Sequence, residues 1–164
     1  MEKKDQIRGG EKYIPPIGWK GFGLKVLNIF DKGDNSWLGN EGKEGEWSIA
    51  YHGIGKENII KKLFNIILNN LKSGPCQLYK SAINIRDKNG SSSGIGVYLS
   101  DKIKVAKNYA KKVKLGNSSK NYQFVIMCRV NPNQIRVPSG FQSYIIVDDS
   151  YECVRPYRIL VKES

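Results

Sequence analysis

The chain is poor in histidine, cysteine and acidic residues. It has one histidine, His52, and 15 acidic residues against 27 lysines and arginines. Any Ser-His-Asp or Cys-His catalytic pair would therefore have to use His52. The three cysteines, Cys76, Cys128 and Cys153, lie far apart and form no CxxC pair, so we expect no metal site. Free thiols in a reducing compartment, cytoplasmic or nuclear, are the simplest interpretation.

Other features are absent as well. The sequence contains no G-x-S-x-G elbow, no Walker lysine motif and no G-x-G-x-x-G following a strand. Its apolar runs are too short to span a bilayer, and the opening "MEKKDQIRGGEKY" lacks the apolar core of a signal peptide. We therefore expect no membrane association. The net charge of +12 permits a nucleic-acid partner, although the basic residues form no stripe interleaved with aromatics.

A length of 164 residues predicts one domain. We expect a flexible basic arm over residues 1–12 and a single domain over residues 13–164. Patterns of apolar residues predict strands at 24–30, 47–51, 97–100, 122–130, 144–149 and 155–163. The polar loop 31–45 contains Trp37 and Leu38, which we expect to pack on the body of the domain.

Two helices are predicted. In the first, residues 56–71, apolar side chains recur every four residues. In the second, residues 101–113, Asp101 suits the N-cap and the inner face carries Ile103, Ala106, Ala110 and Val113. Strands and helices do not alternate regularly. The predicted class is therefore α+β, with mostly antiparallel sheets and two main helices.

His52 is the first candidate site residue. It follows an apolar strand and precedes Gly53, where a ligand can approach the backbone closely, and a helix whose start favours anions. Taken alone, a histidine in this position is usually a half-buried, hydrogen-bonded residue. Tyr98 and Tyr109, taken alone, are typical of packing.

Several short motifs follow one another along the chain, and their order and spacing are informative. Y-H-G at 51–53 follows a strand, GIGVYLSD at 94–101 precedes a helix containing N-Y-A, and VIMCRV and SYIIVDD come later. Tyr109 follows Tyr98 by eleven residues. In order and spacing, residues 46–161 resemble the catalytic domain of the poly(ADP-ribose) polymerases, the diphtheria-toxin-like branch of the ADP-ribosyltransferases. The motif of that branch is His-Tyr-Glu, and this chain resembles a variant, H-Y-x, in which the glutamate is replaced.

The resemblance implies a split-sheet core and a site for NAD as co-substrate, with no metal. His52 would bind a ribose hydroxyl, Gly53 would hold the nicotinamide carboxamide through its backbone, and Tyr109 would stack on the nicotinamide with Tyr98 opposite. Loop 81–95 would be the donor loop and loop 131–143 the acceptor loop. The implied catalytic residues are His52, Tyr98 and Ser143, and the implied NAD-binding residues are His52, Gly53, Tyr98, Ser100 and Tyr109.

Two positions depart from the family pattern. Ser143 stands where polymer-forming members carry a glutamate, and Ala106 stands where a serine often binds the carboxamide. Without the glutamate, elongation of a polymer lacks its general base. The sequence therefore predicts mono-ADP-ribosylation of a protein acceptor with release of nicotinamide. Two alternatives stay open: an inactive fold that binds NAD, ADP-ribose or nucleic acid, and a basic α+β interaction domain in which His52 and the tyrosines are only packing residues.

Overall fold

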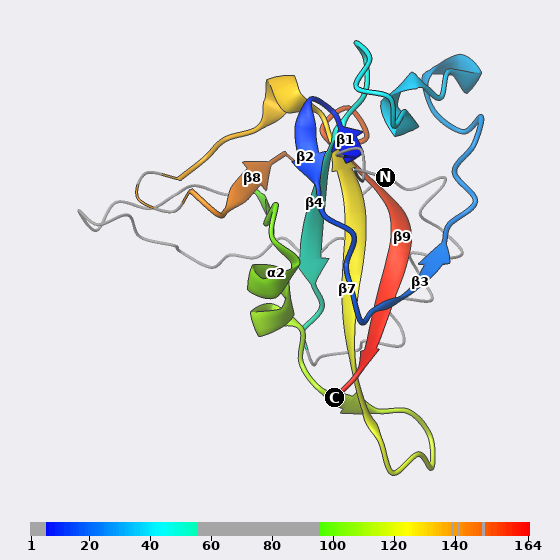
Figure 1. Ribbon diagram of the computed structural model, residues 1–164, viewed down its shortest axis with the longest axis vertical. Coiled ribbons are helices and arrows are strands. Elements are labelled where there is room, and N and C mark those ends of the chain that lie inside the picture. Colours follow the sequence, from blue (N-terminus) through cyan, green and yellow to red (C-terminus); the bar gives the residue numbers. More distant parts are fainter. Residues whose placement is uncertain (1–5, 56–95, 139, 141, 149) are drawn as a thin grey trace, which may run out of the picture.

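The protein is described here by a computed structural model covering residues 6–55, 96–138, 140, 142–148 and 150–164 (Figure 1). It is an α+β fold built mostly from antiparallel sheets, as predicted. A five-stranded sheet has the order β3-β9-β7-β4 with β6 paired to β7, and two two-stranded sheets pair β1 with β2 and β5 with β8. The elements are β1 Gln6–Arg8, β2 Glu11–Tyr13, β3 Lys20–Gly23, β4 Ser48–Gly53, β5 Val97–Leu99, α2 Ile103–Tyr109, β6 Val113–Lys114, β7 Asn121–Val130, β8 Ile145–Val147 and β9 Val154–Glu163, with short 3-10 turns at Asp31–Gly33, Ser36–Leu38 and Pro132–Gln134.

Strand β7 is the middle of the large sheet, and alternation along it gives each face its own core. Phe124, Ile126, Cys128 and Val130 are buried in one cluster, as the sequence predicts. The intervening side chains of β7 pack on the other face with Leu160 of β9 and with α2. Because β7 is covered on both faces, its sequence is apolar at nearly every position.

Helix α2 is shorter than predicted at both ends. It begins at Ile103 with Lys102 as N-cap, and Asp101 makes no capping bond there. Instead, the Lys102 N–H donates to the Ser100 hydroxyl. At the other end the chain turns extended at Ala110, whose carbonyl accepts from Gln123 Nε2 of β7 at 2.6 Å. The Gln123 side chain thus donates to the Ala110 carbonyl, which would bond an N–H of the next helical turn if the helix continued.

The strand predicted at 24–30 does not form. The neighbouring strand β3 pairs instead with β9. Val26 and Phe30 of this segment are buried against Trp37 in a separate cluster. Between them Asn28 has a φ of 60°, and its N–H and side chain bond Asn35. The apolar spacing therefore reflects a turn packed over Trp37, which is buried as expected.

A guanidinium completes the Trp37 cluster. Arg155 of β9 is 3% exposed and makes a two-pronged ion pair with Asp31. Its guanidinium also lies 4.1 Å from the ring centre of Trp47 and 4.9 Å from that of Trp37. Contacts of this kind are strong when desolvated, so Arg155 fastens the 31–47 segment to β9.

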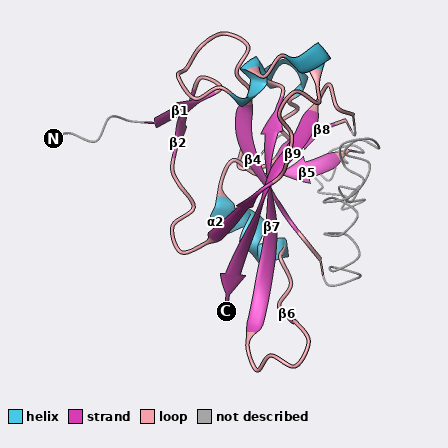
Figure 2. Cartoon of the chain, turned by 90° about the vertical axis from the view of Figure 1, so that its right-hand side faces the viewer, coloured by secondary structure: helices cyan, strands magenta, loops and turns pink. Residues whose placement is uncertain are grey.

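Residues 6–13 form the β1–β2 hairpin, where a flexible arm was expected over residues 1–12. Figure 2 shows this hairpin standing out on one side of the molecule. The buried carboxylate of Glu46 holds its base, because it accepts backbone N–H bonds from residues 41–43 and a longer one from Gly9. The Ser48 hydroxyl also donates to the Gly9 carbonyl. A carboxylate surrounded by backbone donors organises both the loop and the hairpin.

Several expectations concern residues outside the described ranges: the helix at 56–71, Cys76 and the donor loop at 81–95. Within the described ranges, no helix is long and apolar enough to cross a membrane, and no group of three potential metal ligands is found. Cys128 and Cys153 are free and buried, and burial raises the pKa of the Cys128 thiol.

Candidate functional site

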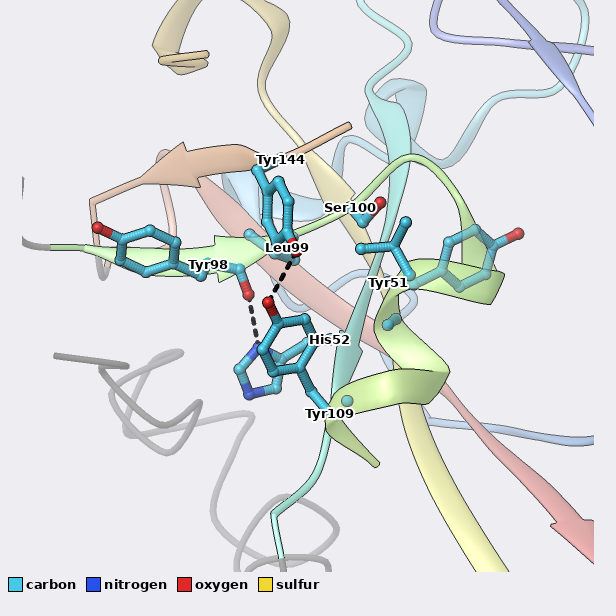
Figure 3. A pocket seen from close by; sticks show the side chains of 10 residues that line it. Tyr51, His52, Tyr98, Leu99, Ser100, Tyr109 and Tyr144 are labelled. Atoms are coloured by element: carbon cyan, nitrogen blue, oxygen red, sulfur yellow. Dashed lines mark hydrogen bonds between the residues drawn. The ribbon is translucent and has the colours of Figure 1, made fainter. Parts of the chain in front are cut away.

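One pocket lies where the end of β4 meets β5 and α2 (Figure 3). Its cavity volume is about 40 Å³, small beside the roughly 300 Å³ or more of ordinary small-molecule sites. Its lining residues are Tyr51, His52, Gly53, Tyr98, Leu99, Ser100, Val105, Ala106, Tyr109 and Tyr144. All five residues that the resemblance assigns to NAD binding are therefore brought to one place from three separate segments of the chain.

The imidazole of His52 is 8% exposed and has a defined orientation. Its Nδ1 lies 2.8 Å from the Tyr98 carbonyl oxygen. A carbonyl can only accept, so Nδ1–H is the donor, and the neutral ring then carries its acceptor lone pair on Nε2. A residue 46 positions later thus fixes the tautomer that accepts a hydrogen bond from a hydroxyl.

Gly53 is required by helix packing. A Cβ atom built there would lie 2.9 Å from the Ala110 nitrogen and 3.0 Å from Tyr109 Cβ, and closer still to the Ala106 carbonyl oxygen. The sequence reading assigned this glycine to close approach of a ligand. In the structure α2 makes the close approach, and this packing brings Tyr109 to the rim of the pocket.

Tyr109 and Tyr144 face each other across the pocket (Figure 3). Their rings lie 6.2 Å apart, edge to face, and their hydroxyls are 2.7 Å apart. Tyr109 remains 37% exposed, so its ring is reachable from solvent. Loss of hydration around the hydroxyl and the bond to Tyr144 raise the pKa of Tyr109 to about 12. The Tyr109 phenol therefore stays neutral near neutral pH.

Tyr98 is placed differently from the role the resemblance gives it. Its ring packs with Ile146 and Tyr144, and in Figure 3 its phenol points away from Tyr109. Burial raises the pKa of Tyr98, and the charge of Arg136 partly opposes this rise. Tyr98 reaches the imidazole through its carbonyl, and the ring that faces Tyr109 is that of Tyr144. The sequence reading missed Tyr144, whose only signal was its place directly after Ser143.

Ser143 lies beside the pocket and is held by two neighbours. The buried Ser100 hydroxyl donates to the Ser143 carbonyl at 2.6 Å, and Lys102 Nζ donates to Ser143 Oγ at 3.2 Å. The Ser100 hydroxyl therefore positions Ser143 by donating its proton. The oxygen of the same hydroxyl accepts from the Lys102 N–H. The sequence reading missed Lys102, which places a positive charge next to the position where the family pattern has a carboxylate.

The lining of the pocket is aromatic and nearly neutral. Its described lining residues include no aspartate, glutamate, lysine or arginine, and His52 contributes the one imidazole. Ala106 is buried in the lining and offers no hydroxyl for a carboxamide. The lining therefore offers aromatic surfaces and one imidazole for contact with a ligand.

Comparison with known proteins identifies no family: no protein-family model and no curated protein matches this chain. A functional assignment therefore depends on the motifs of the sequence and on the geometry of this pocket.

Proposed function

We propose that the chain is an NAD-dependent mono-ADP-ribosyltransferase with the split-sheet core of that superfamily, transferring ADP-ribose to a protein acceptor and releasing nicotinamide. One observation carries the proposal. His52, Gly53 and Tyr109, which the resemblance links through separate motifs, lie on one aromatic pocket. Packing of α2 accounts for Gly53, and a binding role accounts for a ring of Tyr109 that stays 37% exposed beside the oriented imidazole of His52.

The residues of the pocket fit the nicotinamide end of NAD. This ring is a cation in NAD, and desolvated aromatic faces stabilise a cation by up to about 2 kcal/mol. Tyr109 and Tyr144 supply such surfaces. His52 Nε2 would accept from a ribose hydroxyl, since its tautomer is set by the Tyr98 carbonyl. Because the attraction to the tyrosines falls once the ring is neutral, they orient NAD, and acceleration requires alignment and charge stabilisation of the reacting sugar.

The absence of a carboxylate among the described lining residues supports a single transfer. A hydrogen bond to a charged group contributes about 1.5–3 kcal/mol, against about 0.5–1.5 for a neutral pair. A missing general base costs a further factor of about 10²–10⁴. Elongation needs that base, because the attacking ribose hydroxyl is weakly acidic. The Ser143 hydroxyl oxygen accepts a hydrogen bond from Lys102 Nζ, so this partner is a donor and not a base.

A second candidate is a module that binds NAD or ADP-ribose without turnover. It is favoured by Ala106 and Ser143, and by the hydroxyl bond between Tyr109 and Tyr144, which bridges the space between the two rings. Release of nicotinamide above the spontaneous rate distinguishes the two candidates, because a binding module releases none.

Thermal unfolding with NAD or nicotinamide, followed by intact-mass measurement for added ADP-ribose, tests the proposal. Each ligand should raise Tm as RT ln(1 + [L]/Kd) predicts. Tyr109→Ala should abolish the rise, whereas Tyr109→Phe, which keeps the ring, should retain most of it. Mass spectra should show single additions. Long polymers would overturn mono-transfer. No Tm rise with NAD or nicotinamide would overturn the transferase, and no rise with ADP-ribose as well would overturn the binding module.

A further inference from the structure

A second hollow lies on the same side of the molecule. It is a groove of about 740 Å³ between the β1–β2 hairpin, the start of α2 and the loop after β7, and Tyr51 is the one described residue that it shares with the pocket. Figure 1 shows the hairpin and the amino end of β4 at the same end of the molecule as β8.

An open backbone position lies in this groove. Strand β4 is the edge of the large sheet, and alternate residues direct N–H and C=O away from β7. The N–H and C=O of Tyr51 point away from β7 and bond Ser100. Ile49 lies two residues earlier on the same strand, so its N–H and C=O also point away from β7. Two residues before Ile49, the Trp47 N–H donates to the Trp37 carbonyl. Within the described residues, the outward N–H and C=O of Ile49 therefore have no backbone partner, whereas the outward positions at Trp47 and Tyr51 are bonded.

Exposed aliphatic side chains line the groove. Ile14 is 69% exposed and Val137 is 54% exposed, although both are large apolar side chains. Ile103 and Ile135 are partly buried in the same lining. Exposed aliphatic side chains that gather around a groove are typical of a binding surface, whereas scattered ones are not.

The charge of the groove lining favours a partner that carries acidic groups. Four cations, Arg8, Lys12, Lys102 and Lys104, line the groove with two anions, Glu11 and Asp101. The lining thus attracts acidic groups, in keeping with the +12 charge of the whole chain.

We propose that this groove binds an extended, acidic peptide segment of a partner protein, in which acidic residues alternate with aliphatic ones. Its backbone would pair with Ile49, its aliphatic side chains would contact Ile14 and Val137, and its carboxylates would lie near Lys104. Strand addition at a sheet edge is a common mode of peptide recognition. A single-stranded nucleic acid fits less well, because it needs exposed aromatic faces for stacking. In this lining Tyr51 is buried, and Tyr13 is half-buried with the Arg8 guanidinium over its ring.

Fluorescence anisotropy with a short labelled peptide that alternates glutamate and valine tests the proposal, without NAD. Binding should be saturable and should weaken as salt rises. Lys104→Glu should weaken it by about threefold to tenfold, and Val137→Asp by a similar factor. The matched controls are Lys114→Glu and Ile17→Asp, which change an exposed lysine and an exposed isoleucine outside the groove and should leave binding unchanged.

The backbone contact has its own test. Only one edge of an extended peptide can face Ile49, so N-methylation of the valine amides and of the glutamate amides should differ in effect by about fivefold. Equal effects would overturn the pairing with the sheet edge. No binding, equal binding of a lysine-valine peptide, or tighter binding of oligo-dT that Lys104→Glu abolishes would overturn the peptide proposal. The proposal does not depend on ADP-ribose transfer, so either one can fail without the other.

Discussion

Gly53→Ala is the sharpest test of how the pocket is built. The added Cβ would lie inside the normal contact distance of the Ala106 carbonyl oxygen, the Ala110 nitrogen and Tyr109 Cβ. To restore van der Waals separation, α2 must move by roughly 1 Å. The Ala106 carbonyl accepts the Ala110 N–H at 3.2 Å, so this movement strains the last turn of the helix as well.

We expect Gly53→Ala to lower the free energy of unfolding by about 1–3 kcal/mol, as overpacking does. For a chain of this size each kcal/mol lowers Tm by about 2–4 °C. Gly55→Ala is the matched control, because its Cβ would meet nothing within 4 Å. Urea unfolding of both variants measures the effect, and NAD-dependent stabilisation should weaken in Gly53→Ala alone as Tyr109 shifts. Equal stabilities would refute the close packing of α2 on β4.

Three other predictions concern single side chains. Arg155→Lys keeps the charge but loses the two-pronged carboxylate contact, so it should cost about 2 kcal/mol in urea unfolding, whereas Arg158→Lys, at an exposed position of β9, should cost little. Burial opposes ionisation of Glu46, but its backbone donors outweigh burial and lower its pKa below 4.5. Stability from Glu46 is therefore complete above that value and lost as pH falls through the lowered pKa, and Glu46→Gln should flatten urea midpoints measured through the acid range. Ser143→Glu places a carboxylate beside Lys102, and mass spectra should show faster NAD cleavage than in the parent chain; no increase would contradict the assigned position.

The long strands could be predicted because their pattern has one physical cause. Along β7, Ile126 and Met127 enter different cores, so alternation and continuous apolarity both mark a central strand. The segment 24–30 gave a similar signal for another reason, since Val26 and Phe30 pack from a turn whose Asn28 has positive φ. Apolar spacing reports burial, and over a short segment it does not distinguish a strand from a packed turn.

Some residues of the candidate site could be predicted from the sequence, and others could not. Motif spacing linked His52 with Tyr109, and the structure brings them to one pocket. Tyr144 and Lys102 were missed because their positions depend on the register of β5 against β8, which pairs Leu99 with Ile145 and so brings Ser143 and Tyr144 beside the residues that follow β5. The pairing register between strands so distant in the chain is not written in either strand alone.

The place of β9 in the large sheet has a consequence for the order of assembly. Strand β3 is made early in synthesis, yet its pairing partner spans residues 154–163, and the same partner supplies the guanidinium that the Trp37 cluster surrounds. Until those residues leave the ribosome, the amino-terminal third has neither its neighbour nor its counter-charge. Contacts that join such distant parts of a chain form slowly. We therefore expect nascent chains that stop short of residue 154 to depend on chaperones, and the sheet to close in a single late step.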